Sequence, residues 1–202
     1  EDGSGFFYSR LVEGYEKLPQ SERFRDRTRH FHTLAGNVDR PILSPSRNPD
    51  LKLPSYASAY VFQVPGTQTA AAIVALGVER NRMLFLADLA SAIRGDAKWR
   101  KVVDLDDQVS TIAYSGGWLY LRSSKGAPRF QVLRMPLDKP DIAKAETVIA
   151  PSSSVVVNLA GARDGLYVTQ RDGATLSLAR LAPAAAGMPL RREPITLPFA
   201  GN

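Results

Sequence analysis

Two histidines and a few serines are the residues from which hydrolytic chemistry could be built. His30 and His32 are the only histidines, and in an expected strand over residues 29–34 the alternation of side chains would project both from one face. A hydrolase serine sits in a G-x-S-x-G turn between a strand and a helix. The nearest approaches are Gly3-Ser4-Gly5 and Ser115-Gly116-Gly117, and the second is typical of a hairpin turn. We therefore expect no catalytic residues in this chain.

No metal or other cofactor is expected either. Two histidines without a neighbouring cluster of carboxylates or cysteines rarely form a metal site, so both are interpreted as structural polar residues on a strand. Asp104, Asp106 and Asp107 resemble a fragment of a calcium loop, but no glycine and later glutamate follow at EF-hand spacing. A turn between two strands explains them. The absence of cysteine excludes a disulfide scaffold, a zinc–thiolate site and a cysteine nucleophile.

The positive charge of the chain permits binding to polyanions without demonstrating it. The net charge is +6, and the basic residues are spread along the sequence. For their densest group a solvated loop or edge strand is favoured, with a phosphate or carboxylate site as the alternative. That group is Arg23, Arg25, Arg27 and Arg29. Because no basic strip interleaved with aromatic residues is present, nucleic acid is not expected as a partner.

Membrane and targeting signals are missing from the sequence. No apolar run approaches the roughly 18 residues of a membrane span, so no membrane partner is expected. The sequence opens on Glu-Asp-Gly-Ser-Gly, without a methionine or a signal peptide, which is typical of a trimmed N-terminus. The compartment therefore stays open between cytoplasm and periplasm.

Short β-type runs separated by turn signals fill residues 99–149. Four such runs joined by hairpins are the content of one β-propeller blade, a four-stranded antiparallel sheet. They cover residues 109–114, 118–122, 130–135 and 146–149. An apolar run followed by Gly-(Trp/Leu) and a Leu-Tyr pair recurs over residues 155–168, at an offset of roughly 46–48 residues that suits propeller blades.

The chain is therefore interpreted as all-β, a β-propeller fragment of about four blades over residues 1–202. The blades are expected at 5–46, 55–104, 107–150 and 153–198, and the first lacks its innermost strand. Alanine-rich residues 70–75 are assigned to a strand, because an apolar run bounded by Pro-Gly and Gly continues through them. Other expected features are an outer strand at 41–44, helical turns at 88–94 and 139–144, a flexible link at 182–187 and a last outer strand at 190–197.

An ordered set of short motifs runs through these expected blades. They are Phe6-Phe7-Tyr8-Ser9-Arg10, His32-Thr33-Leu34 ahead of Gly36, Leu76-Gly77-Val78-Glu79-Arg80, Trp99-Arg100-Lys101-Val102-Val103, Gly117-Trp118-Leu119-Tyr120-Leu121, Ala127-Pro128-Arg129-Phe130-Gln131-Val132 and Leu197-Pro198-Phe199 with Gly201. Together, over essentially the whole chain, they resemble the propeller of the prolyl oligopeptidase family of serine peptidases. Two departures, Ala35 before Gly36 and Ala150 before Pro151, lie in turns.

The resemblance implies a fold and a function. The family combines a seven-bladed propeller with an α/β-hydrolase domain that carries a Ser-Asp-His triad, and this chain matches only the propeller part. The whole enzyme would hydrolyse short peptides, after proline, and the propeller would restrict access to the active site by size. The implied partners are the α/β-hydrolase domain of the same parent chain and short peptide substrates. Part of the substrate-binding wall would lie near Ser44; an ordinary strand-end serine is the alternative.

Other functions stay open at this point. A free-standing β-propeller could serve as a protein- or peptide-binding module, with its first and last blades completing each other. Nucleic-acid binding ranks last, because the charges are scattered. An open arc of blades would expose a strand edge at one end and a blade face at the other, so we also expect self-association.

Overall fold

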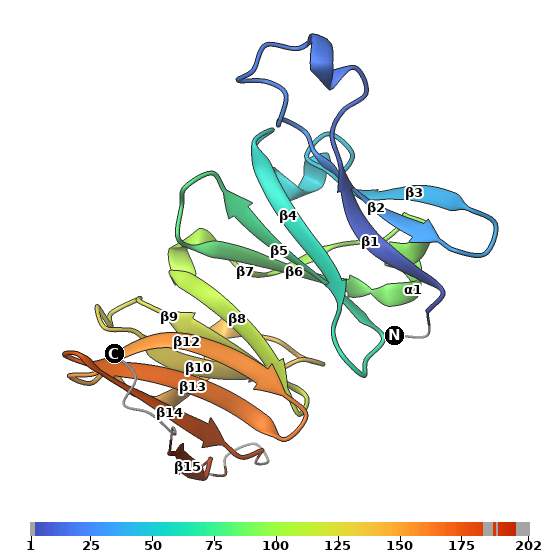
Figure 1. Cartoon of the computed structure of the whole chain (residues 1–202). Helices are drawn as coiled ribbons and strands as arrows, with labels where there is room; N and C mark the ends of the chain where they lie inside the picture. The colour runs from blue at the N-terminus through green and yellow to red at the C-terminus, as the bar shows by residue number, and fades with distance from the viewer. Residues whose placement is uncertain (1–2, 184–187, 189, 197–202) are drawn as a thin grey trace. The chain divides into compact units, whose positions relative to one another are not determined.

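Antiparallel sheets joined by turns make up the chain in the computed structural model, which describes residues 3–183, 188 and 190–196 (Figure 1). These sheets fall into two units, Glu1–Val103 and Asp104–Asn202. Each unit is described by itself. No helix in the described part of the chain has the length and apolar character needed to cross a membrane.

The N-terminal unit contains two sheets, each with its strands in sequence order. The first sheet has β1 (Gly5–Arg10), β2 (Thr28–Thr33) and β3 (Val38–Leu43). The second has β4 (Ala57–Gln63), β5 (Thr69–Leu76), β6 (Arg82–Asp88) and β7 (Arg100–Val103). Single-turn 3-10 helices lie at Tyr15–Lys17 and Pro49–Leu51, and the one α-helix of the described residues is α1 (Leu89–Arg94).

The C-terminal unit contains two four-stranded sheets of the same sequential order. The third sheet has β8 (Val109–Ser115), β9 (Trp118–Ser123), β10 (Gln131–Pro136) and β11 (Glu146–Ile149). The fourth has β12 (Val155–Ala162), β13 (Gly165–Asp172), β14 (Thr175–Leu181) and β15 (Arg192–Ile195). Further 3-10 turns lie at Leu105–Asp107 and Ile142–Lys144. The expected fold class, an all-β propeller fragment built from antiparallel blade sheets, is confirmed.

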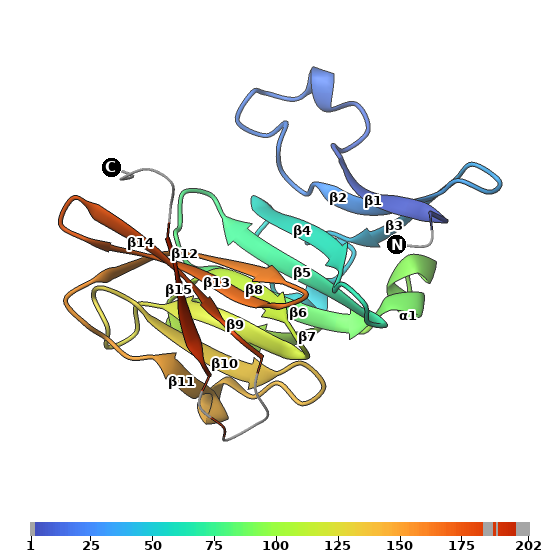
Figure 2. The same ribbon diagram turned by 60° about the horizontal axis from the view of Figure 1, so that its bottom comes forward.

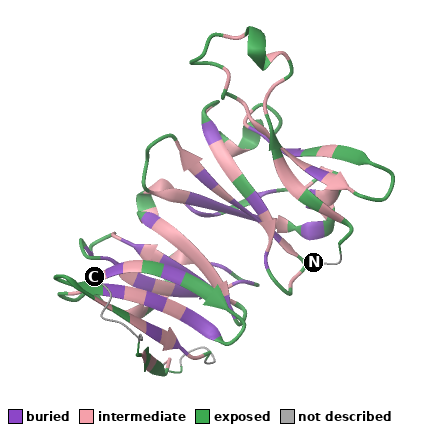
Figure 3. Cartoon of the chain, viewed as in Figure 1, coloured by how far each residue is buried: buried purple, intermediate pink, exposed green. Residues whose placement is uncertain are grey.

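Burial follows the strands, and exposed residues gather at turns and outer edges (Figure 3). In the C-terminal unit one apolar cluster joins the third and fourth sheets. Its buried members are Tyr120, Phe130, Val132, Val156, Leu159, Leu166, Val168 and Leu181. These residues come from β9, β10, β12, β13 and β14 and the turn before β10, so neither sheet could bury its apolar face alone.

The alanine-rich segment forms strand β5, as predicted. Ala70, Ala71 and Ala72 are buried between the flanking strands β4 and β6. Alanine favours helix in isolation, but pairing on both sides satisfies the backbone and the small side chains suit a fully buried strand. Tertiary context therefore decides the conformation here.

The helical turn expected at residues 88–94 is α1. Its N-cap is Asp88, whose carboxylate accepts the Ser91 N–H at 2.8 Å, and Gly95 ends it with φ 83°. The outer strand of the first sheet, expected at 41–44, instead begins at Val38. It pairs with β2 from the start and tolerates Pro41 because it lies at the sheet edge.

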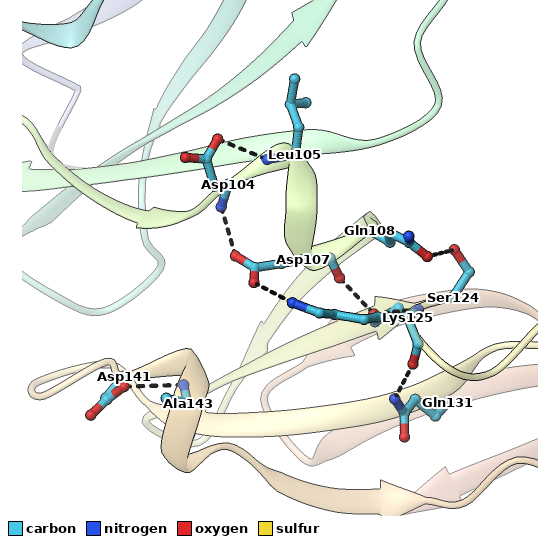
Figure 4. Close-up of polar contacts among 10 residues, drawn as sticks. Asp104, Leu105, Asp107, Gln108, Ser124, Lys125, Gln131, Asp141 and Ala143 are labelled. Carbon is cyan, nitrogen blue, oxygen red and sulfur yellow. Dashed lines mark hydrogen bonds and ion pairs between the residues drawn. The ribbon is translucent and has the colours of Figure 1, made fainter.

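The Asp104-Leu105-Asp106-Asp107 segment forms the turn that was predicted for it (Figure 4). The Asp104 carboxylate accepts the Leu105 N–H at 2.8 Å. Asp107 accepts the Asp104 N–H at 2.8 Å while the Asp104 side chain accepts the Asp107 N–H, and these two reciprocal bonds form a capping box. Lys125 Nζ lies 3.6 Å from Asp107 Oδ1. Two of the three carboxylates are thus used in the turn itself.

The long connection from β1 to β2 extends away from the first sheet in both views (Figures 1 and 2). It ends where Asp26 accepts the Ser46 N–H at 2.8 Å and donates its own N–H to Ser55 O at 2.6 Å. These bonds fix the segment that leads into β2.

Of the later expected features, residues 184–187 of the flexible link and residue 197 of the last strand lie outside the described residues.

Candidate peptide-binding site

Neither histidine is arranged for serine catalysis. His30 Nδ1 lies 3.3 Å from Thr28 O, and His32 Nδ1 lies 2.7 Å from Asp39 Oδ1. No described serine hydrogen-bonds to either ring. A serine nucleophile needs such a base within hydrogen-bond reach, so the described residues contain no serine–histidine pair.

The histidines belong to an aromatic face of the first sheet. As predicted, both project from one face of β2, and β1 places Phe6 opposite His32 and Tyr8 opposite His30. The ring centroids are 5.0 Å apart in the first pair and 5.4 Å in the second. These contacts favour the structural interpretation of both histidines.

Asp39 on β3 is the carboxylate that the sequence analysis did not bring to these histidines. Its hydrogen bond with His32 holds the Asp39 pKa below the usual value. Burial, followed by the nearby Asp39, raises the pKa of Tyr8. No group of three metal-ligating residues occurs in the described part of the chain, so His32 and Asp39 form a pair and not a centre.

An open cavity of about 770 Å³ lies in the N-terminal unit, lined by the first two sheets and α1. Its walls are mainly apolar and aromatic, with two glutamines. The lining residues are Ser4, Gly5, Phe6, Phe7, Phe31, Tyr60, Val61, Phe62, Gln63, Gln68, Leu89, Ala90 and Ile93. Its size and lining are typical of sites that take small ligands or peptide segments.

The aromatic walls of the cavity are organised in pairs. Phe7 and Phe31 meet edge to face, with centroids 5.0 Å apart, and Tyr60 and Phe62 lie 5.4 Å apart on β4. Gln63 is partly engaged, since its Nε2 donates to Thr67 O at 2.8 Å. Rigid rings next to a few amides provide apolar contact and hydrogen bonding with little loss of side-chain entropy.

Two edge strands also contribute to the lining of this cavity. Four consecutive lining residues come from the start of the chain and β1, and four more from β4. In the sheet order among the described residues, β1 and β4 are each an edge strand with one unpaired side. An extended peptide could therefore add hydrogen bonds to the apolar contacts.

Ser44, the predicted substrate contact, is not part of this cavity. It follows β3 and is only 3% exposed. Its hydroxyl accepts the Arg47 N–H at 3.2 Å and lies 3.3 Å from Ser46 Oγ, while its own N–H donates to Asn48 Oδ1 at 3.2 Å. These bonds favour the alternative, an ordinary serine that caps a turn; the substrate role remains an untested prediction.

The cavity was missed at the level of sequence. Its aromatic residues come from three strands, and none of these strands alone has a pattern that differs from that of an ordinary half-buried strand. Only the pairing of β1 with β2 and the approach of β4 bring Phe7, Phe31 and Phe62 around one space. The aromatic runs Phe6-Phe7 and Tyr60-Val61-Phe62 were the available signals in the sequence.

Comparison with known proteins agrees with the fold and with the ordered motifs. The family model described as "Prolyl oligopeptidase, N-terminal beta-propeller domain" matches residues 1–196. Prolyl oligopeptidase A of Amanita bisporigera is 24% identical over 160 residues, which are 73% of this chain but 20% of that protein. The chain thus spans about a fifth of this curated relative.

Solved structures with the same fold include two of prolyl peptidases. Prolyl oligopeptidase B from Galerina marginata, bound to a 35mer hydrolysis and macrocyclization substrate, superposes with a TM-score of 0.75 at 16% identity, over 100% of this chain and 27% of that one. A structure from a study of two prolyl endopeptidases gives a TM-score of 0.73 at 18% identity, over 99% and 28%. With nearly its whole length matched by the family model, the chain belongs to the prolyl oligopeptidase N-terminal β-propeller family.

Proposed function

We propose that this chain is the peptide-admitting propeller portion of a serine peptidase of the prolyl oligopeptidase type. The whole enzyme hydrolyses short peptides after proline, by acyl transfer through a serine of an α/β-hydrolase domain in the same parent chain. Within the present residues the function is binding, not catalysis. The observation that carries the proposal is the aromatic cavity of the N-terminal unit, found in a chain of this family.

The cavity suits an extended, proline-containing peptide. A proline ring packs well on flat aromatic faces, and Phe62 and Tyr60 offer such faces on one wall. The unpaired edges of β1 and β4 can hydrogen-bond the backbone of an extended peptide. A cavity of this size holds a few residues, which agrees with short peptides as substrates.

Peptide titration tests the proposal directly. We expect an acetylated octapeptide with a central Phe-Pro to bind the 202-residue chain, measured by calorimetry, and the same peptide with Phe-Pro changed to Ser-Ser to bind about tenfold more weakly. Phe62→Ala should weaken binding of the Phe-Pro peptide by a similar factor. Tyr56→Ala is the matched control, because Tyr56 is 55% exposed and outside the cavity. Equal affinity of the two peptides would overturn the proposal.

Two alternative explanations of the cavity predict different experimental outcomes. A fourth strand of the first sheet, supplied by a longer parent chain, would protect the β1 edge in the parent and abolish peptide binding there. A free-standing binding module would bind peptide but would come from a gene product without a downstream G-x-S-x-G segment and later Asp and His. The intact mass and sequence of that product, set beside this chain, distinguish a peptidase from a binding module.

A further inference from the structure

Two neighbouring arginines at the start of β2 have no acidic partner. Neither guanidinium group of Arg27 and Arg29 makes a hydrogen bond or ion pair with any residue that the structure describes, and the Nε of each is buried without an acceptor. Arg27 makes one ring contact, with its Cζ 5.7 Å from the Phe24 centroid. By contrast, Arg134 and Arg180 pair with carboxylates at 2.7 Å. Both arginines are half-buried, and a polar atom that is buried without a partner is unfavourable, so this pair is a candidate for an external anion.

The electrostatic environment points in the same direction. The pKa of Arg29 is lowered, first by burial and then by the positive charge of Arg27. The interaction with Tyr60 raises this pKa. The nearest carboxylate in sequence, Asp26, is already bonded to the Ser46 N–H and hydroxyl. An anion close to both guanidinium groups would relieve their repulsion.

The pair also lies next to the aromatic cavity. Arg29 and Phe31 are two residues apart on β2, so their side chains project from the same face, and Phe31 lines the cavity. Tyr60, which interacts electrostatically with Arg29, lines it as well. A ligand that places an apolar group in the cavity can therefore present a charged end to the arginines.

We infer that Arg27 and Arg29 bind a peptide carboxylate at the rim of the aromatic cavity. Two planar guanidinium forks match the two oxygens of a carboxylate, and buried donors favour an acceptor that brings its own charge. The carboxylate is either the C-terminus of the peptide or an acidic side chain close to its apolar residues. This inference rests on the proposed function, because the apolar part of the same peptide occupies the cavity.

Paired peptides test the inference in the 202-residue chain. Acetyl-Ala-Phe-Pro-Phe with a free C-terminus should bind about tenfold more tightly than its C-terminal amide. Acetyl-Glu-Phe-Pro-Phe-amide, which carries only a side-chain carboxylate, distinguishes the two sources. Arg27→Gln and Arg29→Gln should each bring the ratio of acid to amide affinity close to one. Arg25→Gln is the matched control, because Arg25 is exposed in the same connection.

The outcomes separate this inference from the proposed function. If all three peptides bind equally, the carboxylate site is wrong and peptide binding stands. If none binds, peptide binding is wrong, and the arginines are then tested with sodium acetate, which should shift their Nε–H resonances where sodium chloride does not. No shift with acetate, or a larger shift with inorganic phosphate at equal ionic strength, would overturn the carboxylate inference.

Discussion

The guanidinium carbon of Arg134 lies 4.3 Å from the centroid of the Trp118 ring, in the third sheet. Arg134 is only 1% exposed, yet its charge is balanced: Nη2 lies 2.7 Å from Glu146 Oε2 and 3.2 Å from Met188 O. One buried cation thus links β9, β10 and β11 to the segment that precedes β15.

Replacing Arg134 by alanine should lower the free energy of unfolding by about 3–5 kcal/mol, because packing on Trp118 and the ion pair with Glu146 are lost. Urea denaturation measures the change. The double variant Arg134→Met with Glu146→Leu removes both charges and fills the space, and should recover most of the loss. A change below about 0.5 kcal/mol in Arg134→Ala would show that the pair is not structural.

Gly161 on β12 is a second point where the C-terminal unit tolerates little change. A Cβ added to it would stand 1.9 Å from Tyr114 O on β8, and the neighbouring Ser115 Oγ donates to Ala162 O at 2.7 Å. We expect Gly161→Ala to lower the free energy of unfolding by about 3 kcal/mol, since backbone must move. Gly126→Ala is the control: it has open space around it, so only its φ of +65° should matter, at about 1 kcal/mol. Similar losses in the two variants would contradict the close approach of β12 and β8.

Local chemistry made the strands and turns predictable from sequence. The short β-type runs of β8 and β9, the Gly116-Gly117 hairpin and the capping aspartates around Leu105 each depend on residues within a few positions of one another. Such features set the period and the chain reversals of a propeller sheet whatever surrounds it.

The cavity and the unpaired arginines could not be predicted in the same way. Phe31 and Tyr60 belong to different sheets, and Asp39 reaches His32 only through the register of β2 with β3. The interpretation of Arg27 and Arg29 also changed. The sequence favoured a solvated loop or edge strand, whereas burial of each Nε favours the alternative, an anion site. Non-local packing decides such cases.

Acid should destabilise the fourth sheet through Arg180. Its hydrogen bonds hold the pKa values of both Asp164 and Glu193 below their usual range. Because these values are depressed in the folded state, the stabilisation is present above the unfolded values, about 4, and is lost as pH falls through the folded ones. The melting temperature should therefore fall from pH 5 to pH 2.5, and less steeply in Arg180→Gln than in the wild type or in Arg163→Gln, an exposed control. Parallel curves for all three would exclude this source of acid sensitivity.

Self-association at the β1 edge is the remaining prediction. Among the described residues β1 has one unpaired side, and Phe6 on it is 50% exposed without a charged neighbour on the strand before Arg10. Open edges of this kind pair with other strands, so the chain should sediment as a concentration-dependent oligomer at micromolar concentration. Phe6→Lys should shift it towards monomer, since a lysine on an edge strand opposes pairing. Val78→Lys adds the same charge at a fully exposed turn and should leave the sedimentation unchanged; a wild-type chain that is strictly monomeric would refute the prediction.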